Sequence, residues 1–326
     1  MSVETTYLGL NLKSPIVVGS CGLCDSVDRL VAMERAGAGA VVLKSIFEEQ
    51  IIFDIKSSAN VFAPVDQYGA SYEYVASHVA PDFMSRYFDF VREAKSRLSI
   101  PVIGSINCYS FENWLTYARS FEEAGCDAME LNISLLPYES KLSVDDVERL
   151  FEDIINTLKR FVSIPISIKV GSHFTDMAKF MQKLSWMGIN GVTIFSKPMN
   201  IDVDLEKITL SQAPLLSEPC EVYNTLRWVA ILSQKMRCEL CASTGIHTPD
   251  DVVKMLLAGA QAVQVVSCLY KNGIEHLTTL NQGLRQWMER HEFNRIEQFR
   301  GRLAVKSNED ASMFLRTQYM KFVDKV

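Results

Sequence analysis

This chain lacks an excess of basic residues, long apolar runs and a signal-like start, and each absence removes a class of function. Lysine and arginine number 33 against 39 aspartate and glutamate residues, so the net charge of -6 leaves no basic face for nucleic acid. No run reaches the roughly 18 apolar residues of a membrane span. The first residues lack the basic-then-apolar order of a secretory signal. We therefore expect a cytoplasmic protein with a small-molecule substrate, and neither nucleic acid nor membrane as partner.

Two further absences bear on the architecture. No Gly-x-Gly-x-x-Gly turn follows the first predicted strand, which argues against an open dinucleotide-binding sheet. No linker or low-complexity stretch divides the 326 residues, of which 48% are hydrophobic. A chain of this size and composition can bury one large core. We expect a single domain over residues 1–326.

The eight cysteines include two pairs with Cys-x-x-Cys spacing, Cys21 with Cys24 and Cys238 with Cys241. A zinc site or a redox disulfide needs both thiols of a pair aimed at one point. Cys238 and Cys241 lie in an apolar run that reads as a strand, where residues three apart face opposite sides. The sequence favours reduced core cysteines over a disulfide, and we expect no metal site.

Short β-rich runs alternate along the chain with stretches of helical period, which predicts right-handed βαβ units and a parallel sheet. The predicted strands are Ile16–Gly19, Gly39–Lys44, Pro101–Ile106, Ala128–Asn132, Pro165–Val170, Gly191–Phe195, Cys238–Ala242 and Ala262–Val266. The predicted helices include Asp28–Ala36, Phe83–Arg97, Phe111–Ala124, Val144–Phe161, Thr175–Met187 and Thr248–Leu257. Eight such strands favour an α/β fold of the (β/α)₈ TIM barrel type.

The connections between these units carry their own signals. Three helices run into Ala-Gly-Ala or Ala-Gly-Cys before the next strand, at Gly37, Gly125 and Gly259, which predicts glycine C-caps. The long connections after strands two and six, Ile46–Pro81 and Lys197–Pro219, are expected to cover the site as lids. Beyond the eighth unit, residues 292–326 are expected to form a charged helical extension.

In such a barrel the residues at the carboxyl ends of the strands point into the site. These are Ser20, Lys44, Ser45, Asn107, Asn132, Ser134, Lys169, Ser196, Thr244, Gly245 and Ser267. These strand ends carry lysines, amides and hydroxyls but no carboxylate. This set of groups predicts a site for an anionic, planar, hydrogen-bonding ligand. The small and hydroxyl residues that follow the last two strands each lead into a helix, and this arrangement favours a phosphate site.

Several segments resemble the dihydroorotate dehydrogenase family in order along essentially the whole chain. They are Thr5–Gly22, Val42–Ser45, Glu130–Ser134, Ser167–Lys169, the glycine-bearing segments of the last two strands and Glu297–Gly301. The resemblance implies a barrel that binds flavin mononucleotide (FMN). It places Ser20, Cys21 and Gly22 along the flavin through backbone groups, Lys44 and Ser45 on its ring system, and Asn132 and Lys169 as hydrogen-bond partners. Ser243, Thr244, Gly245, Ser267 and Cys268 are expected near the phosphate, and Asn107 and Ser196 complete the cofactor-binding set.

The chain departs from the family pattern mainly on the substrate side. Leu135 stands where the family carries a Cys or Ser that acts as general base, and Gly69–Ala76 replaces the usual substrate loop. Phe195 and Val266 stand where an Asn and a Gly are expected. A base, if one is needed, must come from the loops, and the candidates are Tyr138, Glu139, Ser140, Tyr72 and Glu73. With Tyr138 chosen, the expected catalytic set is Lys44, Lys169, Asn132, Ser134 and Tyr138.

The resulting hypothesis is an FMN-dependent oxidoreductase of pyrimidine metabolism that acts on a CH–CH bond of a small, planar, dihydroorotate- or dihydropyrimidine-like substrate. The resemblance also implies a homodimer, with an electron-transfer partner left open. Two alternatives remain. One is a barrel lyase or aldolase in which Lys169 forms a Schiff base without flavin. The other is a catalytically retired flavin-binding protein that serves a partner.

Overall fold

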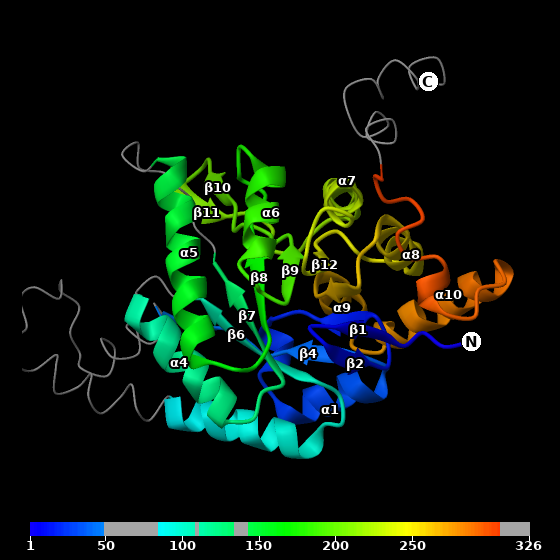
Figure 1. Ribbon diagram of the computed structural model, residues 1–326, viewed down its shortest axis with the longest axis horizontal. Helices are drawn as coiled ribbons and strands as arrows, with labels where there is room; N and C mark the ends of the chain where they lie inside the picture. The colour runs from blue at the N-terminus through cyan, green and yellow to red at the C-terminus, as the bar shows by residue number, and fades with distance from the viewer. Residues whose placement is uncertain (49–83, 108–110, 134–142, 307–326) are drawn as a thin grey trace, which may run out of the picture.

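The computed structural model describes residues 1–48, 84–107, 111–133 and 143–306, except for the side chains of residues 111 and 112. At its centre, parallel strands form a closed barrel (Figure 1). The ring closes because β4 pairs with β3 on one side, at Val17 and Ala40, and with β6 on the other, at Val41 and Val102. In chain order the barrel strands are β3 (Ile16–Val18), β4 (Ala40–Val42), β6 (Val102–Asn107), β7 (Ala128–Asn132), β8 (Ile166–Val170), β9 (Gly191–Ile194), β12 (Glu239–Ser243) and β13 (Ala262–Val265).

All eight predicted strands are confirmed, with small shifts at their ends. Successive residues of one strand belong to two separate apolar clusters: Val41 packs in the layer between strands and helices, whereas Val42 packs inside the barrel. Because successive side chains of a strand point to opposite faces, a strand buried on both faces reads as a continuous apolar run. This is why the strands were readable from sequence. A short extra strand, β5 (Ile46–Phe47), continues beside the end of β6.

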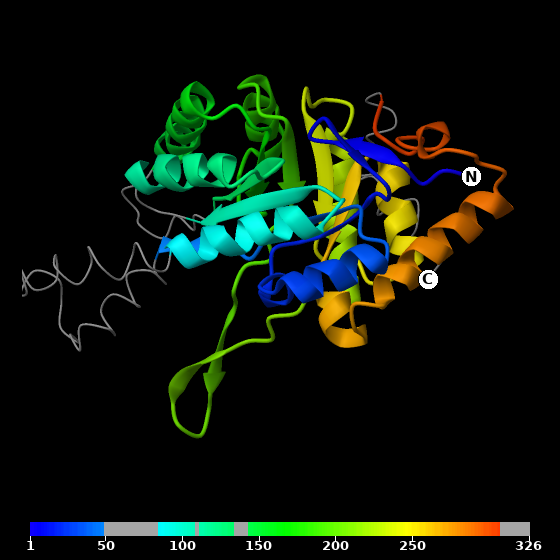
Figure 2. The ribbon, with the colours of Figure 1, turned by 90° about the horizontal axis from the view of Figure 1, so that it is seen from below.

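Helices surround the barrel (Figures 1 and 2). They are α1 (Val27–Arg35), residues 84–97, α4 (Phe111–Glu123), α5 (Val144–Phe161), α6 (Met177–Trp186), α7 (Val222–Leu232), α8 (Pro249–Ala258), α9 (Ser267–Asn272) and α10 (His276–Arg290). Helix α5 has the predicted bounds, begins at a capping box between Ser143 and Asp146, and buries Phe151 and Leu158. The predicted glycine C-caps are confirmed, since Gly37, Gly125 and Gly259 have φ of 99°, 87° and 113°.

Two hairpins were not predicted. The first, β1 (Thr5–Tyr7) with β2 (Leu10–Leu12), buries Tyr7, Leu8 and Leu12 among the residues inside the barrel. The backbone N–H of Leu8 donates to Glu239 at the start of β12. A Cβ on Gly191, the first residue of β9, would lie 2.6 Å from Leu8. The hairpin therefore plugs the amino-terminal end of the barrel.

The second hairpin occupies the long connection after β9 and consists of β10 (Ile201–Asp204) and β11 (Thr209–Gln212). Figure 2 shows it standing away from the barrel. The expectation that the whole connection covers the site is therefore wrong for its central part, because β10 and β11 pair only with each other. Its two ends do return to the cavity, as the next subsection describes.

Two other expectations concern segments at the edge of the described chain. The long connection after the second strand lies outside the described residues beyond Glu48. The C-terminal extension contains the 3₁₀ turn η4 (Ile296–Gln298) in its described part, which ends at residue 306. Among the helices that the structure describes, none has the length and apolar composition of a membrane-spanning segment.

Candidate functional site

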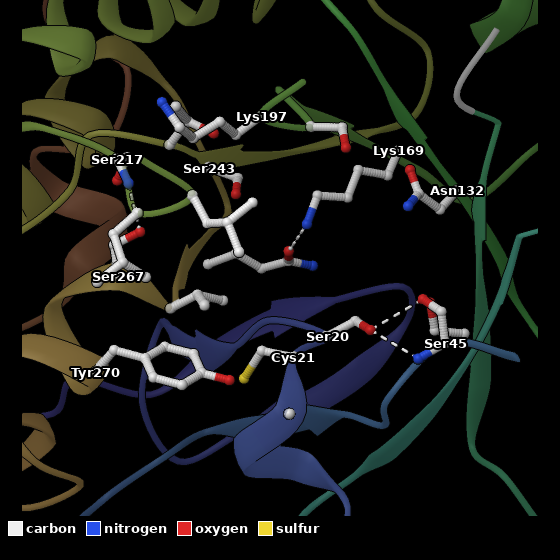
Figure 3. A pocket seen from close by; sticks show the side chains of 18 of the residues that line it. Ser20, Cys21, Ser45, Asn132, Lys169, Lys197, Ser217, Ser243, Ser267 and Tyr270 are labelled. Atoms are coloured by element: carbon white, nitrogen blue, oxygen red, sulfur yellow. Dashed lines mark hydrogen bonds between the residues drawn. The ribbon is translucent and has the colours of Figure 1, made fainter. Parts of the chain in front are cut away.

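A cavity of about 690 Å³ opens at the carboxyl ends of the barrel strands (Figure 3). Most positions predicted to bind a cofactor line it, namely Ser20, Cys21, Gly22, Lys44, Ser45, Asn132, Lys169, Ser196, Ser243, Thr244, Gly245 and Ser267. Asn107 does not line it, because it lies in the ladder between β5 and β6. Cys268 is fully buried and does not line it either. Ser134, Leu135 and Tyr138, with the other proposed bases, lie outside the described residues.

A chain of serine hydroxyls forms one wall. Ser45 Oγ lies 2.9 Å from Ser20 Oγ and 2.6 Å from Ser105 Oγ, and the backbone N–H of Ser45 donates to Ser20 Oγ at 2.9 Å. Figure 3 shows the contacts between Ser20 and Ser45. These contacts join the end of β3 to the end of β4 and to the middle of β6. Ser105 was missed because it sits inside the apolar run of β6 and not at its end.

Lys169 is held by two buried polar residues from other strands. Its Nζ donates to Gln264 Oε1 at 2.9 Å and lies 3.9 Å from Glu130 Oε1. Gln264 Nε2 in turn donates to Glu130 Oε2 at 2.6 Å. The site therefore contains a carboxylate that the sequence analysis did not assign to it. Glu130 lies inside β7, two residues before Asn132, so it does not contradict the expectation that no carboxylate stands at a strand end. Glu130 and Gln264 each interrupt an apolar strand, and that interruption is the signal that could have identified them.

The same carboxylate links the cavity to the barrel plug. Thr193 Oγ1 donates to Glu130 Oε2 at 2.7 Å, and Tyr7 OH lies 3.3 Å from Thr193 Oγ1. Burial raises the pKa of Tyr7 well above its ordinary value, so its phenol stays protonated and can donate. A continuous series of polar contacts therefore runs from the plug to Lys169.

Some polar atoms of the cavity wall are left without partners. Within the described part of the chain, the buried Asn132 Oδ1 and Glu130 Oε1 accept no hydrogen bond. Lys44 Nζ, also at the wall, makes no hydrogen bond or ion pair with those residues. Unpaired buried acceptors cost roughly 1–3 kcal/mol each, so such atoms are expected where a ligand or water completes them.

The opposite end of the cavity is formed by the loops after β12 and β13. Thr244 and Gly245 both have positive φ, 80° and 79°, so the chain turns sharply after β12. A Cβ on Gly245 would lie 2.1 Å from the backbone nitrogen of Val222 at the start of α7, so only glycine fits there. Ser267 begins α9, and its Oγ accepts from the backbone N–H of Ser217 at 2.8 Å.

The ends of the β10–β11 connection complete this side. Lys197, Leu215, Leu216 and Ser217 all line the cavity. Lys197 Nζ donates to Glu221 at 2.7 Å, and Ser217 Oγ lies 3.2 Å from His247 Nε2. Burial lowers the pKa of His247, with a smaller contribution from the Lys271 charge, so its ring is neutral at physiological pH. The sequence predicted that the connection Lys197–Pro219 covers the site but singled out none of these residues, because they do not lie at strand ends.

A closed parallel barrel with a cavity of lysines, amides and hydroxyls at its carboxyl mouth defines a (β/α)₈ enzyme. The sequence model of the dihydroorotate dehydrogenase family matches residues 74–288, and the chain belongs to this family. It is therefore an oxidoreductase of the dihydroorotate dehydrogenase type.

Named relatives cover nearly the whole chain. The catalytic subunit of dihydroorotate dehydrogenase B (NAD(+)) from Thermoplasma volcanium is 30% identical over 313 residues, which span 93% of this chain and 99% of the relative. Its counterpart from Thermoplasma acidophilum is 29% identical over 306 residues, or 92% and 98% of the two chains. A chloroplastic dihydropyrimidine dehydrogenase (NADP(+)) from Arabidopsis thaliana is 24% identical over 339 residues, or 92% and 76%.

Proposed function

We propose that this protein is an FMN-dependent oxidoreductase that acts on a CH–CH bond of a small, planar, dihydropyrimidine-like substrate. The observation that carries the proposal is the set of uncommitted polar groups in the cavity, above all Lys44 Nζ and Asn132 Oδ1. Membership of the dihydroorotate dehydrogenase family supports the reaction class. Relatives are named for both dihydroorotate and dihydropyrimidine substrates, which supports the ring type.

The residues present fit a flavin ring at the end of the cavity near β4, β7 and β8. Bound FMN would supply the hydride acceptor of the reaction. Lys44 and Lys169 present two ammonium groups to the same cavity. Cations in a partly buried site favour a ligand that gains negative charge during reaction. Asn132 offers an amide whose oxygen is unpaired in the described residues, so it can accept from a ring N–H.

The other end of the cavity fits a phosphate. The loop with Ser243, Thr244 and Gly245 follows the seventh barrel strand, and Ser267 follows the eighth. Loops in these positions often hold phosphate in (β/α)₈ enzymes, because backbone N–H groups at helix starts bind anions. The two ends of the cavity thus match the two chemically different ends of FMN.

The contacts of Lys169 do not favour the Schiff-base lyase. A Schiff base requires an amine with a free lone pair that can attack a carbonyl. Here Nζ donates to Gln264 and lies near the Glu130 carboxylate, contacts that suit an ammonium. We therefore assign Lys169 to charge stabilisation. Tyr138 stays a prediction as the base, and the naming of relatives as catalytic subunits supports a second, electron-transferring chain as partner.

The proposal is tested by the visible spectrum of the purified protein before and after anaerobic addition of dihydropyrimidines and dihydroorotate. We expect a flavin spectrum that bleaches with at least one of these substrates. Lys44→Ala is expected to lose flavin retention or reduction. Lys13→Ala is the matched control, because Lys13 does not line the cavity and its Nζ donates a hydrogen bond to Ser99. A colourless protein that does not take up FMN would refute the proposal.

A further inference from the structure

The two Cys-x-x-Cys pairs lie in different kinds of structure, the first on a turn and the second in a barrel strand. Cys21 and Cys24 lie on the turn after β3, at the 3₁₀ helix η1 (Gly22–Cys24), and their sulfur atoms are 3.8 Å apart. The backbone N–H of Cys24 donates to the Cys21 carbonyl at 3.0 Å. A turn closed in this way keeps its end Cα atoms within about 7 Å, a separation that a disulfide can bridge with a small adjustment. Cys241, by contrast, is fully buried in β12.

The two sulfur atoms of the first pair have unequal surroundings. Cys21 is a free thiol that is partly exposed and lines the cavity, so the expectation that it lies in the core is wrong. In Figure 3 its sulfur points toward the hydroxyl of Tyr270. Cys24 is fully buried, and its thiol donates to the Gly19 carbonyl at 3.6 Å. The Cys21 sulfur can therefore react with a molecule in the cavity, whereas the Cys24 sulfur can react only with the Cys21 sulfur.

Hydrogen bonds further distinguish the pair. The Cys24 thiol, together with the backbone N–H groups of Leu23 and Cys24, lowers the pKa of Cys21 to about 7. The same contact and burial raise the pKa of Cys24. Three other titratable groups interact with the pair in the described structure: Tyr270 from α9, Asp25 beside Cys24, and Tyr87 from the helix of residues 84–97. An accessible thiolate beside a protonated second thiol is the arrangement of reactive cysteines.

We propose that Cys21 and Cys24 form a dithiol that reacts with hydroperoxides and closes to a disulfide at the rim of the cavity. A hydroperoxide is favoured over a larger disulfide oxidant because Cys21 faces the cavity only in part and Cys24 not at all. A disulfide oxidant would first form a mixed disulfide with Cys21, and the cavity would then have to hold the half of the oxidant that is attached to Cys21. The proposal concerns the thiol groups of Cys21 and Cys24, whereas the family resemblance assigns only the backbone of Cys21 to the flavin. It does not rest on the proposed function.

The chemistry balances in two steps. The Cys21 thiolate attacks one peroxide oxygen, an S–O bond forms, the O–O bond breaks, and the departing oxygen leaves as water or an alcohol after taking a proton. The Cys24 sulfur then loses its proton and attacks the Cys21 sulfur, so that an S–S bond forms and the S–O bond breaks. The hydroxide that leaves takes that proton and becomes water. The two thiols lose two electrons, and the peroxide gains them.

The test is to add hydrogen peroxide in small molar excess to the reduced full-length protein at pH 7. Thiols are then blocked by alkylation and the products are analysed by peptide mass spectrometry. We expect a Cys21–Cys24 disulfide, two hydrogen masses lighter, before any change at the exposed Cys220. A thiol with pKa about 7 is half thiolate at this pH, so Cys21 should react roughly tenfold faster than an ordinary cysteine.

Variants separate the two roles. Cys21→Ser should abolish the disulfide and slow peroxide consumption roughly tenfold. Cys24→Ala should leave Cys21 as a sulfenic acid that dimedone traps, and circular dichroism would verify that this variant folds. Cys238→Ser is the matched control from the second pair and should behave as the wild type, because burial raises the pKa of Cys238 to about 12. Cys21 and Cys24 still free after Cys220 has oxidised, or unchanged kinetics in Cys21→Ser, would overturn the proposal.

Discussion

At the scale of single residues, Glu130 is the group that balances the charge of Lys169. Its side chain is 1% exposed, accepts hydrogen bonds from Thr193 and Gln264, and has one oxygen 3.9 Å from Lys169 Nζ. A buried cation without its counter-ion is destabilising, because no attraction to an opposite charge offsets the hydration that the cation lost on burial. The residue that positions Lys169 therefore lines the cavity from inside β7 and not from a strand end.

We predict that Glu130→Gln lowers the free energy of unfolding by about 3 kcal/mol, because the shape of the side chain is kept while its charge is removed. Urea unfolding measures the change. Asp28→Asn is the control, since Asp28 is 85% exposed and its ion pair with Arg97 should contribute less than about 1 kcal/mol. Equal stability of wild type and Glu130→Gln would show that the carboxylate does not balance Lys169.

A second residue-scale prediction concerns Gly245. Gly245→Ala should destabilise the protein by more than 2 kcal/mol, on the order of the cost of serious overpacking, and should weaken FMN binding. Its new Cβ would strike the backbone of α7, 2.1 Å away. Gly125→Ala is the matched control, because Gly125 has a similar φ of 87° but nothing within 4 Å of the added atom. That variant should cost only the left-handed strain of about 1–2 kcal/mol. Thermal unfolding and flavin titration of both variants compare the two effects.

At the scale of elements, the β10–β11 hairpin is separable from the barrel. Its strands pair only with each other, and its flanks meet where the N–H of Ala213 donates to the Asn200 carbonyl at 3.3 Å. We predict that residues 201–212 can be replaced by a two-residue turn with little change in the melting temperature. Calorimetry measures this. Loss of cooperative unfolding would mean that the hairpin is part of the barrel core.

How far the elements could be predicted depended on the pattern each one leaves. Buried parallel strands leave apolar runs and α5 leaves a regular amphipathic repeat, so both were located well. The β1–β2 hairpin turns at Leu8 and Gly9, which both have positive φ. Such turns usually carry Asn-Gly or Asp-Gly, and a leucine in that position hides the turn. In β11, Thr209, Ser211 and Gln212 leave no apolar alternation to follow.

The residues of the candidate site could also be predicted only where the sequence pattern specifies their position. Strand-end residues such as Lys44 and Thr244 could be predicted, because a barrel puts every strand end at one mouth. Lys197 and Ser217 were predicted only as parts of a connection that covers the site, and not as individual site residues, because the sequence does not specify which parts of that connection reach the cavity. The nearness of Cys21 to Cys24 also escaped prediction, because it depends on a 3₁₀ turn that the spacing alone does not specify.

At the scale of the whole molecule, a ligand that binds only the folded barrel must stabilise it. We predict that FMN at 100 times its dissociation constant adds about 2.7 kcal/mol to the free energy of unfolding. Riboflavin, which lacks the phosphate, should add less at the same concentration, because it leaves the loops at Gly245 and Ser267 unfilled. Melting curves with each compound test both statements. Equal shifts for FMN and riboflavin would contradict a phosphate site in these loops.

The plug formed by β1 and β2 sets a condition on how the chain can fold. Tyr7, Leu8 and Leu12 are synthesised well before Cys241 and Ala262, with which they share one buried cluster. Until β12 and β13 emerge, these apolar side chains have no complete barrel to enter. These side chains therefore stay exposed until β12 and β13 have been synthesised, and a chain that stops before residue 262 is expected to bind chaperones.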